Sequence, residues 1–360
     1  MISIVLGTRP EIIKMSPVIR ECEDRGVEYS ILHTGQHYSY EMDRKFFEQL
    51  DLPRADNNLD VGSGTHAQQT GRIMKGIEKV LMRDPVDAVL VQGDTNTVLA
   101  GALVSAKLQI PVGHVEAGLR SFDRRMPEEI NRIVADHVGE YLFAPTEISR
   151  GYLLDEGLPE AKIHVVGNTI VDSLRQNLAI SESKVDPLKD LGLSEKGYFL
   201  VTSHRAENVD VRQRFEGILE GLRSIHEEFD LPVIYPIHPR ARKFLKRYKL
   251  ETGGIELIDP VGFLEFLRLE SGARLVLTDS GGVQEETCIL GVPCVTLRDN
   301  TERPETIEVG SNVLAGAEPF RILERTREML ISRGNWSNPF GDGESSRRIV
   351  NITTEDIRQS

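Results

Sequence analysis

The stretch MISIVLGTRPEIIKMSP (Met1–Pro17) places a short apolar run, Ile2–Leu6, directly before a glycine turn and a segment of helical periodicity. Pro10 suits the first turn of a helix, where its fixed φ is helical and its missing N–H is not needed. The pattern predicts a strand, a turn and a helix, although the turn matches neither a GxGxxG nor a GxxxxGK[ST] motif. Arg9 would then lie at the positive end of the helix, with Lys14 one turn further on.

Apolar runs of strand length alternate with helical segments along the rest of the chain. The runs expected to form strands are Ile2–Leu6, Glu28–Leu32, Ala88–Val91, Val112–Val115, Tyr141–Phe143, His164–Val166, Tyr198–Val201, Val233–Pro236, Glu256–Ile258, Leu275–Leu277 and Cys294–Leu297. Segments such as Thr65–Met82 and Arg212–Glu228 have helical spacing between them. Several runs are apolar almost throughout, as in parallel strands covered on both faces. The alternation predicts a doubly wound α/β fold.

The length of 360 residues favours two domains over one core. A break follows Val166–Thr169, where a helix and the polar stretch Ser181–Lys196 separate two α/β halves. We expect a Rossmann-like domain over residues 1–170 and a second over residues 171–345. A short helix over 346–360 would pack back on the first. Because ligands of such sheets sit at the carboxyl ends of the strands, a cleft between the halves is the expected site.

Composition narrows the classes of partner. A net charge of −13 argues against nucleic acid, because a protein that binds a phosphate backbone needs a basic face. The basic stretch Arg240–Lys249 is best interpreted as the solvated face of a helix. Cys22, Cys288 and Cys294 lack metal-ligand spacing and predict neither a metal nor a disulfide. With no run of membrane-spanning length and no signal-peptide pattern, we expect a cytoplasmic protein without a membrane partner.

Acidic residues follow three elements of the first half. Asp94 comes after Ala88–Val91, Glu116 comes directly after Val112–Val115, and Glu128 stands at the helix start MPEEINR. Asp94 and Glu128 each have an ordinary explanation, as a helix cap or a first-turn acid. Glu116 is different, because a carboxylate directly after a buried strand must find a partner or face a site. Three acids on neighbouring loops favour a shared pocket.

The second half supplies groups that bind anions. TSHRAEN (Thr202–Asn208), TDSGGVQEE (Thr278–Glu286) and RDNTERP (Arg298–Pro304) all follow expected strands. Backbone N–H groups at a helix start without side chains form an anion site, although Gly281-Gly282 can also be a bare turn. Glu286, one turn later, could accept both hydrogens of a vicinal diol. With Arg9 and Arg303 these features predict a nucleotide-sugar site between two facing Rossmann-like domains, the GT-B arrangement.

Seven motifs in register over about three hundred residues carry a resemblance to a known family. They are GTRPEIIK, QGDTNT, HVEAGLRS, MPEEINR, TSHRAEN, DSGGVQEE and RDNTERPE. The chain resembles the non-hydrolysing UDP-N-acetylglucosamine 2-epimerases, cytoplasmic enzymes of polysaccharide biosynthesis. The resemblance implies a GT-B fold, a UDP-sugar substrate, a homodimer, and neither a metal nor a nicotinamide cofactor.

The resemblance also implies roles for particular residues. The sugar would be handled by the acid/base carboxylates Asp94, Glu116 and Glu128. The diphosphate would be surrounded by Arg9, Lys14, His204 and Arg303, of which His204 also counts as catalytic because it stabilises the leaving group. The remaining nucleotide contacts would come from Ser280, Gly281, Gly282, Glu286 at the ribose and Phe266 at the uracil. A second substrate molecule that acts as an activator would bind near Gln36, Arg205 and His238.

The implied reaction is the reversible epimerisation of UDP-N-acetylglucosamine (UDP-GlcNAc) at C2 to UDP-N-acetylmannosamine (UDP-ManNAc). The hydrogen on C2 is not acidic, so the C1–O bond to UDP would break first, towards an oxocarbenium. A carboxylate would then remove the C2 proton to leave 2-acetamidoglucal, and UDP would add back to C1 while a proton arrives on the other face of C2. Alternatives with the same nucleotide half are a hydrolysing epimerase that releases N-acetylmannosamine and UDP, and a 2-epimerase for a modified sugar such as a UDP-diacetamido-uronic acid. A GT-B glycosyltransferase and a catalytically silent UDP-sugar sensor are further alternatives.

Overall fold

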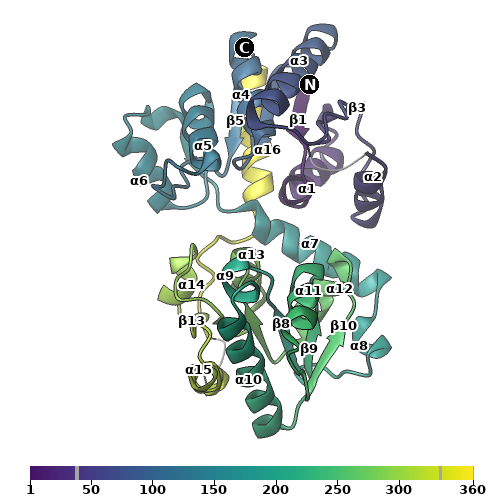
Figure 1. Ribbon diagram of the computed structural model, residues 1–360. Helices are drawn as coiled ribbons and strands as arrows, with labels where there is room; N and C mark the ends of the chain where they lie inside the picture. Colours follow the sequence, from purple (N-terminus) through teal and green to yellow (C-terminus); the bar gives the residue numbers. More distant parts are fainter. Residues whose placement is uncertain (37–39, 332–334, 360) are drawn as a thin grey trace. The chain divides into compact units, whose positions relative to one another are not determined.

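A computed structural model describes residues 1–36, 40–331 and 335–359 of the chain (Figure 1). It divides into two compact units: residues 1–176 with 340–360, and residues 177–339. The division falls inside helix α7 (Thr169–Lys184), a few residues beyond the boundary expected at 170. The chain returns to the first unit at Phe340, where helix α16 (Ser345–Gln359) packs against α1 (Arg9–Asp24). Figure 1 accordingly shows the yellow α16 among the purple and blue elements of that unit.

The first unit is built on a sheet of seven parallel strands in the order β3-β2-β1-β4-β5-β6-β7. The strands are β1 (Ile2–Leu6), β2 (Tyr29–His33), β3 (Asn57–Asn58), β4 (Ala88–Gln92), β5 (Val112–Val115), β6 (Tyr141–Ala144) and β7 (Ile163–Val165). The direction of winding reverses between β1 and β4, which pair from Ile2 with Ala88 to Ile4 with Leu90. In open α/β sheets this switch point opens a crevice at the carboxyl ends of the two strands.

Helices cover the sheet of the first unit. Besides α1, α7 and α16 they are α2 (Tyr40–Gln49), α3 (His66–Arg83), α4 (Asn96–Lys107), α5 (Pro127–Val138) and α6 (Glu147–Asp155), with a short 3₁₀ turn at Glu160–Lys162. Val5, Val89 and Val91 form one core cluster with apolar residues of α3, α4 and α5. Gly101 allows α4 to approach the sheet, because a Cβ there would lie 2.8 Å from Val91 Cγ1.

The second unit repeats this winding with six parallel strands in the order β10-β9-β8-β11-β12-β13. The strands are β8 (Phe199–Thr202), β9 (Val233–Pro236), β10 (Ile255–Ile258), β11 (Leu275–Thr278), β12 (Cys294–Thr296) and β13 (Asn312–Leu314). Its switch point lies between β8 and β11, which pair from Phe199 with Leu275 to Thr202 with Thr278. The TSHRAEN and TDSGG stretches leave the sheet side by side at these two strand ends.

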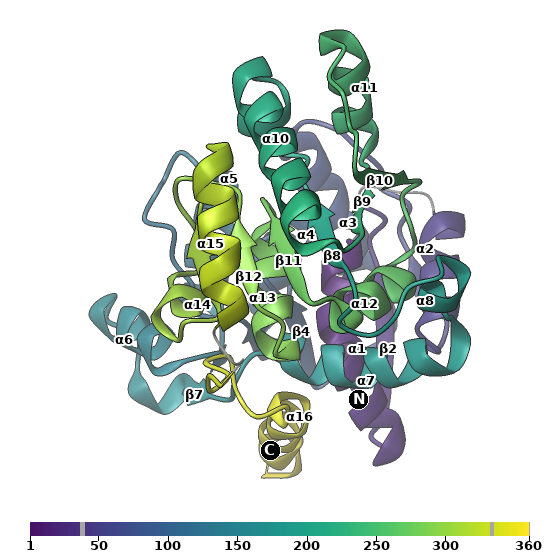
Figure 2. The ribbon, with the colours of Figure 1, turned by 90° about the horizontal axis from the view of Figure 1, so that it is seen from below.

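The helices of the second unit are α8 (Pro187–Asp190), α9 (Ala206–Val209), α10 (Arg212–Phe229), α11 (Pro239–Tyr248), α12 (Phe263–Gly272), α13 (Gly281–Leu290), α14 (Pro304–Glu308) and α15 (Pro319–Ile331). Helices α10 and α15 lie side by side in Figure 2 and pack together. Their contact is close at Gly221 of α10, where a Cβ would lie 3.0 Å from Ile322 of α15.

Cys22, Cys288 and Cys294 are buried free thiols. None of the helices described is long and apolar enough to cross a membrane.

The predicted fold class is confirmed, since both sheets are parallel and doubly wound. The sequence missed β3 and β13, and both are edge strands of two or three residues that begin with asparagine. A strand this short carries too few side chains for an alternating or apolar pattern to stand out. Helix α7 also continues through Lys184, into the stretch expected to be a polar connection.

Candidate functional site

The chain crosses the switch point of the first unit at Gly7, where close packing requires a glycine. A Cβ at Gly7 would lie 1.9 Å from Thr34 Oγ1 and 2.5 Å from Thr97 Oγ1. The two threonine hydroxyls lie 2.8 Å apart, and the side-chain oxygen of Gln36 accepts hydrogen bonds from both the N–H and the hydroxyl of Thr97, at 3.0 and 2.8 Å. The Gln36 N–H also donates to the backbone oxygen of Gly7 at 3.2 Å, so these bonds fix the loops after β1, β2 and β4 relative to one another.

Glu11, which was not among the predicted site residues, accepts hydrogen bonds from the N–H groups at the start of α1. Its Oε2 accepts from the N–H of Gly7 at 2.6 Å and of Thr8 at 2.8 Å, and its Oε1 accepts from the Thr95 hydroxyl at 2.5 Å. An anion at this helix end would therefore meet the Arg9 side chain and not those two N–H groups. The Arg9 guanidinium carbon lies 5.6 Å from the centre of the Phe46 ring.

Replacing Glu11 by glutamine should flatten part of the pH dependence of stability. Burial raises the pKa of Glu11 to about 7, although bonds from Thr95, Gly7 and Thr8 oppose the rise. A raised pKa favours the protonated folded protein, so this contribution is complete below about pH 4.5 and is lost as the pH rises towards 7. Between these limits the free energy of unfolding of Glu11→Gln should gain up to about 3 kcal/mol relative to wild type.

The measurement is urea unfolding of both proteins at several pH values across this window. Glu140→Gln, at an exposed glutamate of the same unit paired with Lys162, serves as the control and should track wild type. A difference between Glu11→Gln and wild type that stays constant with pH would contradict the prediction.

A cavity of 270 Å³ in the first unit brings together several predicted site residues. Its lining consists of Gln36, Ser63, Gly64, His66, Gln69, Asp94, Thr95, Asn96, Pro127, Glu128 and Asn131. Asn131 donates to the backbone oxygen of Asp94 at 2.8 Å, and Arg132 forms an ion pair with the Asp94 carboxylate. Asn131 and Arg132 were not among the predicted site residues, although both belong to the MPEEINR motif. Their spacing along α5, one turn beyond Glu128, was the signal that could have shown them.

Glu116, at the end of β5, is held by contacts on both carboxylate oxygens. Lys14 Nζ lies 2.5 Å from Oε1, and Gln92 Nε2 donates to Oε2 at 2.5 Å. The residue is buried and has a φ of 69°. A left-handed conformation costs a non-glycine residue about 1–2 kcal/mol, and such residues persist where their surroundings fix them, often at active sites. Lys14 therefore contacts an acid of the first unit, and its contact with the diphosphate, which the resemblance implies, stays a prediction.

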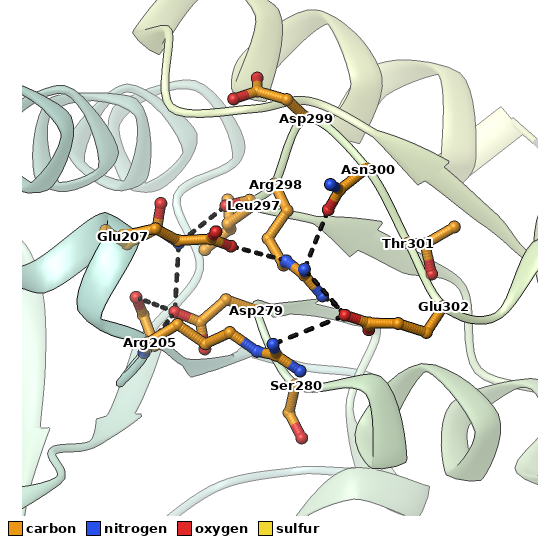
Figure 3. A network of polar contacts seen from close by, with 12 residues as sticks. Arg205, Glu207, Asp279, Ser280, Leu297, Arg298, Asp299, Asn300, Thr301 and Glu302 are labelled. Carbon is orange, nitrogen blue, oxygen red and sulfur yellow. Dashed lines mark hydrogen bonds and ion pairs between the residues drawn. The ribbon is translucent and has the colours of Figure 1, made fainter. Parts of the chain in front are cut away.

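At the switch point of the second unit, the buried carboxylate of Asp279 organises the loop after β8. It accepts from the N–H groups of His204 and Arg205 at 3.0 Å, from the Ser203 hydroxyl at 2.9 Å and from Asn208 at 3.1 Å. Figure 3 shows Asp279 beside Arg205. His204 Nδ1 lies 3.3 Å from the same group. The His204 ring is thus oriented by a residue that directly precedes the Ser-Gly-Gly turn.

The start of α13 is open because its first two residues are glycines. Neither Gly281 nor Gly282 has a positive φ, so the backbone conformation does not demand glycine. The nearest atom to a Cβ would be Glu302 Oε2, 3.4 Å from position 281, and Ser280 Oγ, 3.9 Å from position 282. The glycines therefore leave space in front of the helix, where an anion can approach the N–H groups.

Glu286 lies one turn into α13 and has an acidic neighbour that the sequence analysis missed. Glu270 of α12 is fully buried. Burial, together with the charge of Glu286, raises the pKa of Glu270 well above its ordinary value. A raised pKa favours the neutral form of Glu270, which lessens the repulsion between the two neighbouring carboxyl groups.

Ion pairs connect the RDNTERP loop with the loop after β8. Arg298 pairs with Glu302 at 2.8 Å and with Glu207 at 2.7 Å, and Arg205 lies 3.6 Å from Glu302 (Figure 3). Arg303 follows directly and its Nε lies 3.3 Å from Glu285. The loop that carries Arg303 is therefore held at the same edge of the sheet as the TSHRAEN stretch.

The other predicted residues of the second unit lie nearby or on its core. The rings of His204 and His238 have centres 5.6 Å apart. Burial and the neighbouring His204 and Arg240 lower the pKa of His238. Phe266, on α12, is half-buried against a core cluster.

The predicted residues that belong to the first unit are Arg9, Lys14, Gln36, Asp94, Glu116 and Glu128. Those of the second unit are His204, Arg205, His238, Phe266, Ser280, Gly281, Gly282, Glu286 and Arg303.

Two doubly wound parallel sheets, each with charged loops at its switch point, place the protein in the GT-B class of folds. Comparison with known proteins narrows this class. The family profile described as UDP-N-acetylglucosamine 2-epimerase matches residues 20–354. The chain belongs to this family, and the resemblance drawn from its motifs is confirmed at that level.

Within the described residues, no group of three histidine, cysteine, aspartate or glutamate side chains is placed to hold a metal ion.

Individual relatives are similar over nearly their whole length. The chain is 56% identical to the UDP-N-acetylglucosamine 2-epimerase of Methanocaldococcus jannaschii over 98% of each protein. It is 44% identical to a UDP-2,3-diacetamido-2,3-dideoxy-D-glucuronate 2-epimerase of Pseudomonas aeruginosa, over 96% of this chain and 97% of the relative. The crystal structure of the M. jannaschii enzyme in complex with UDP-GlcNAc and UDP superposes with a TM-score of 0.83, at 56% identity over 98% of this chain and 99% of that one.

Proposed function

We propose that the protein interconverts UDP-GlcNAc and UDP-ManNAc without net hydrolysis, by eliminating UDP to 2-acetamidoglucal and adding it back. The observation that carries the proposal is that Asp94 and Glu128 line one cavity, while Glu116 follows β5, the strand next to β4, with its Oε2 3.8 Å from where a Cβ of Gly93 would lie. Proton transfers on opposite faces of C2 need at least two positioned acid/base groups. The identity to an enzyme of this name supports the choice of substrate.

The nucleotide would be held by the second unit. The open start of α13 suits the diphosphate, with Ser280, Gly281 and Gly282 as donors and Arg303 as the charged partner. Glu286 would accept the ribose hydroxyls, and Phe266 would pack on the uracil. The His204 ring, oriented by Asp279, would stabilise the charge that develops on the departing UDP.

The acidic groups of the first unit would carry the proton transfers. Breaking the C1–O bond gives the sugar oxocarbenium character, which makes the C2 hydrogen acidic enough for a carboxylate to remove. Lys14 and Gln92 each hold one oxygen of Glu116, and Asn131 and Arg132 hold Asp94. These contacts fix the orientation of both acids. Proton transfer to and from a single carbon requires this, because pre-positioned groups react faster.

An NMR time course in D₂O with UDP-GlcNAc tests the function. We expect UDP-ManNAc that carries deuterium at C2, because the proton removed by a carboxylate exchanges with solvent before another returns. Accumulation of free N-acetylmannosamine and UDP would show the hydrolysing alternative, and an acceptor-dependent release of UDP would show a glycosyltransferase. A product that retains its original C2 hydrogen would rule out elimination and readdition, and no turnover would leave a binding protein.

A modified UDP-sugar is the second candidate substrate, supported by the 44% identity to the diacetamido-glucuronate epimerase. The two enzymes would share the nucleotide half and differ at the sugar. Comparing kcat/KM for UDP-GlcNAc and the diacetamido-uronate decides between them, since the preferred sugar should lead by well over about tenfold if the site is built for it.

Two properties of the family complete the proposal. We propose that a second UDP-GlcNAc activates the enzyme near Gln36, Arg205 and His238, and that the active form is a cytoplasmic homodimer. Gln36 lines the cavity of the first unit, and Arg205 pairs with Glu302 in the second. Sigmoidal dependence of rate on UDP-GlcNAc and the mass measured by sedimentation test the two statements separately.

A further inference from the structure

His114 lies inside the apolar run of β5 and is fully buried, with a polar partner on each ring nitrogen. Its Nδ1 is 2.6 Å from Asp136 Oδ1, and its Nε2 is 2.8 Å from the backbone oxygen of Gly93. The second carboxylate oxygen of Asp136 lies 2.7 Å from an Arg120 nitrogen and accepts from the N–H of Gly118 at 3.2 Å. The ring, the carboxylate and the guanidinium form one continuous buried network.

The geometry indicates that His114 is an imidazolium ion. A carboxylate and a carbonyl are both acceptors, so both ring nitrogens must donate, and a neutral ring has only one N–H. Burial alone would lower the pKa of His114, but the charge and hydrogen bond of Asp136 and the bond to Gly93 raise it. Burial would likewise raise the pKa of Asp136, and His114 and Arg120 lower it.

The network joins the three segments that carry the predicted acids. Gly93 directly precedes Asp94, and Gly118 follows Glu116 by two residues. Asp136 lies on α5, the helix whose first turn contains Glu128. A shift of His114 would reach Gly93 directly, and it would reach α5 and Gly118 through the carboxylate of Asp136.

We propose that His114, as a doubly donating imidazolium held by Asp136 and Arg120, is the positioning residue that fixes the mutual geometry of the three carboxylates. This inference rests on the proposed function, because it assigns the network to the same reaction. His114 does not touch the substrate in this role and acts only through the backbone of the acid-bearing segments.

Burying the charges of His114 and Asp136 costs free energy of desolvation, and a positioning role for His114 gives a reason for that cost. A buried ion pair is often no more stabilising than apolar side chains of the same volume, and β5 is otherwise suited to an apolar core. The bonds of the network also end on backbone that is conformationally demanding. Gly118 has a φ of 78°, and a Cβ there would lie 2.3 Å from the Ser149 backbone oxygen.

Substitutions at His114 test the proposal, because a positioning residue should change kcat and leave substrate binding almost unchanged. His114→Phe keeps a ring of similar size without hydrogen bonds, and we expect kcat to fall about 100-fold with KM within about threefold, since a displacement near 1 Å at reacting groups costs about that much. His114→Gln keeps one donor and should retain more activity than His114→Phe. Unchanged kcat in the soluble, folded phenylalanine variant would overturn the proposal, as would equal kcat losses in both variants.

His33 provides the matched control. It is a histidine of the same unit, equally buried, on β2. His33→Phe should lower the thermal stability as His114→Phe does, while kcat stays within about threefold of wild type. If His33→Phe lowers kcat as strongly as His114→Phe, the effect is general destabilisation and the proposal is wrong.

A spectroscopic test does not depend on activity or on the stability of the phenylalanine variant. In protein labelled with ¹⁵N at its nine histidines, the His114 signals should show a proton on both ring nitrogens at about pH 8, above the usual histidine pKa. In the Asp136→Asn variant, only one ring nitrogen of His114 should carry a proton. A neutral ring in the wild type would overturn the proposal. An imidazolium in a protein that does not turn over UDP-GlcNAc would instead show that the proposed function is what failed.

Discussion

Replacing Glu116 by glutamine is expected to lower kcat for the interconversion of UDP-GlcNAc and UDP-ManNAc by about three orders of magnitude. General acid/base groups contribute about 10²–10⁴ to the rate, and an amide cannot accept the C2 proton. The substitution keeps the size of the side chain, although its NH2 group cannot accept from Lys14 or Gln92 as the second carboxylate oxygen does. The affinity for UDP should stay within about twofold, because the nucleotide would be held by the second unit. Asp94→Asn and Glu128→Gln should also lose activity, and the largest loss identifies the group that removes the proton.

The exchange of the C2 hydrogen for deuterium is the decisive measurement for Glu116→Gln. If Glu116 removes the proton from UDP-GlcNAc, deuterium incorporation into the substrate pool should disappear together with turnover. Glu140→Gln is the control, because it removes an exposed glutamate of the same unit and should leave kcat unchanged. Retention of more than about a tenth of wild-type kcat by Glu116→Gln would exclude it as an acid/base group.

The location of the acids could be predicted from the sequence because strand ends are easy to recognise. Val112–Val115 is apolar apart from His114 and is followed at once by Glu116, and Asp94 follows Ala88–Gln92 in the same way. Parallel strands deliver the residues after them to one edge of a sheet. Bringing Asp94 and Glu116 to one edge of the sheet therefore required only the strand positions and the rule of doubly wound sheets, whereas Glu128 stands at the start of a helix.

The partners of these acids could not be predicted, because they depend on contacts between residues distant in sequence. Lys14 had an equally good place at a phosphate, and only the packing of α1 brings it to Glu116, 102 residues away. His114 looked like one polar residue in a strand, and Asp136 like one acid on an amphipathic helix. Their pairing depends on how α5 lies on the sheet, which periodicity does not specify.

Glu11 shows the same limit at shorter range. The spacing from Thr8 to Glu11 matches a capping box, yet the sequence was interpreted through Arg9 as a helix end that could receive an anion. The structure shows that Glu11 already occupies the N–H groups of Gly7 and Thr8. A local pattern that fits both a structural and a functional role cannot decide between them, and the bonds that decide it also involve Thr95, 84 residues away.

Replacing Arg303 by alanine is expected to weaken UDP binding about 10- to 100-fold, because a charge-assisted bond to phosphate contributes about 1.5–3 kcal/mol. Arg303 precedes α14 and contacts Glu285 of α13, the helix whose open start would hold the phosphates. Arg303→Lys keeps the charge without the planar fork and should fall between alanine and wild type. Titration calorimetry with UDP gives the affinities.

The loss should be specific for the phosphates, which separates this role from a general effect on the second unit. Binding of uridine, followed by ligand NMR, should be the same for wild type and Arg303→Ala, because the base and ribose would contact Phe266 and Glu286. Arg327→Ala removes an arginine paired with Glu228 on the surface of the same unit, and it should leave both affinities unchanged. If Arg303→Ala binds UDP as wild type does, or loses uridine to the same extent, the diphosphate is not held by the loop that follows β12, and the nucleotide half of the proposed site must be placed elsewhere.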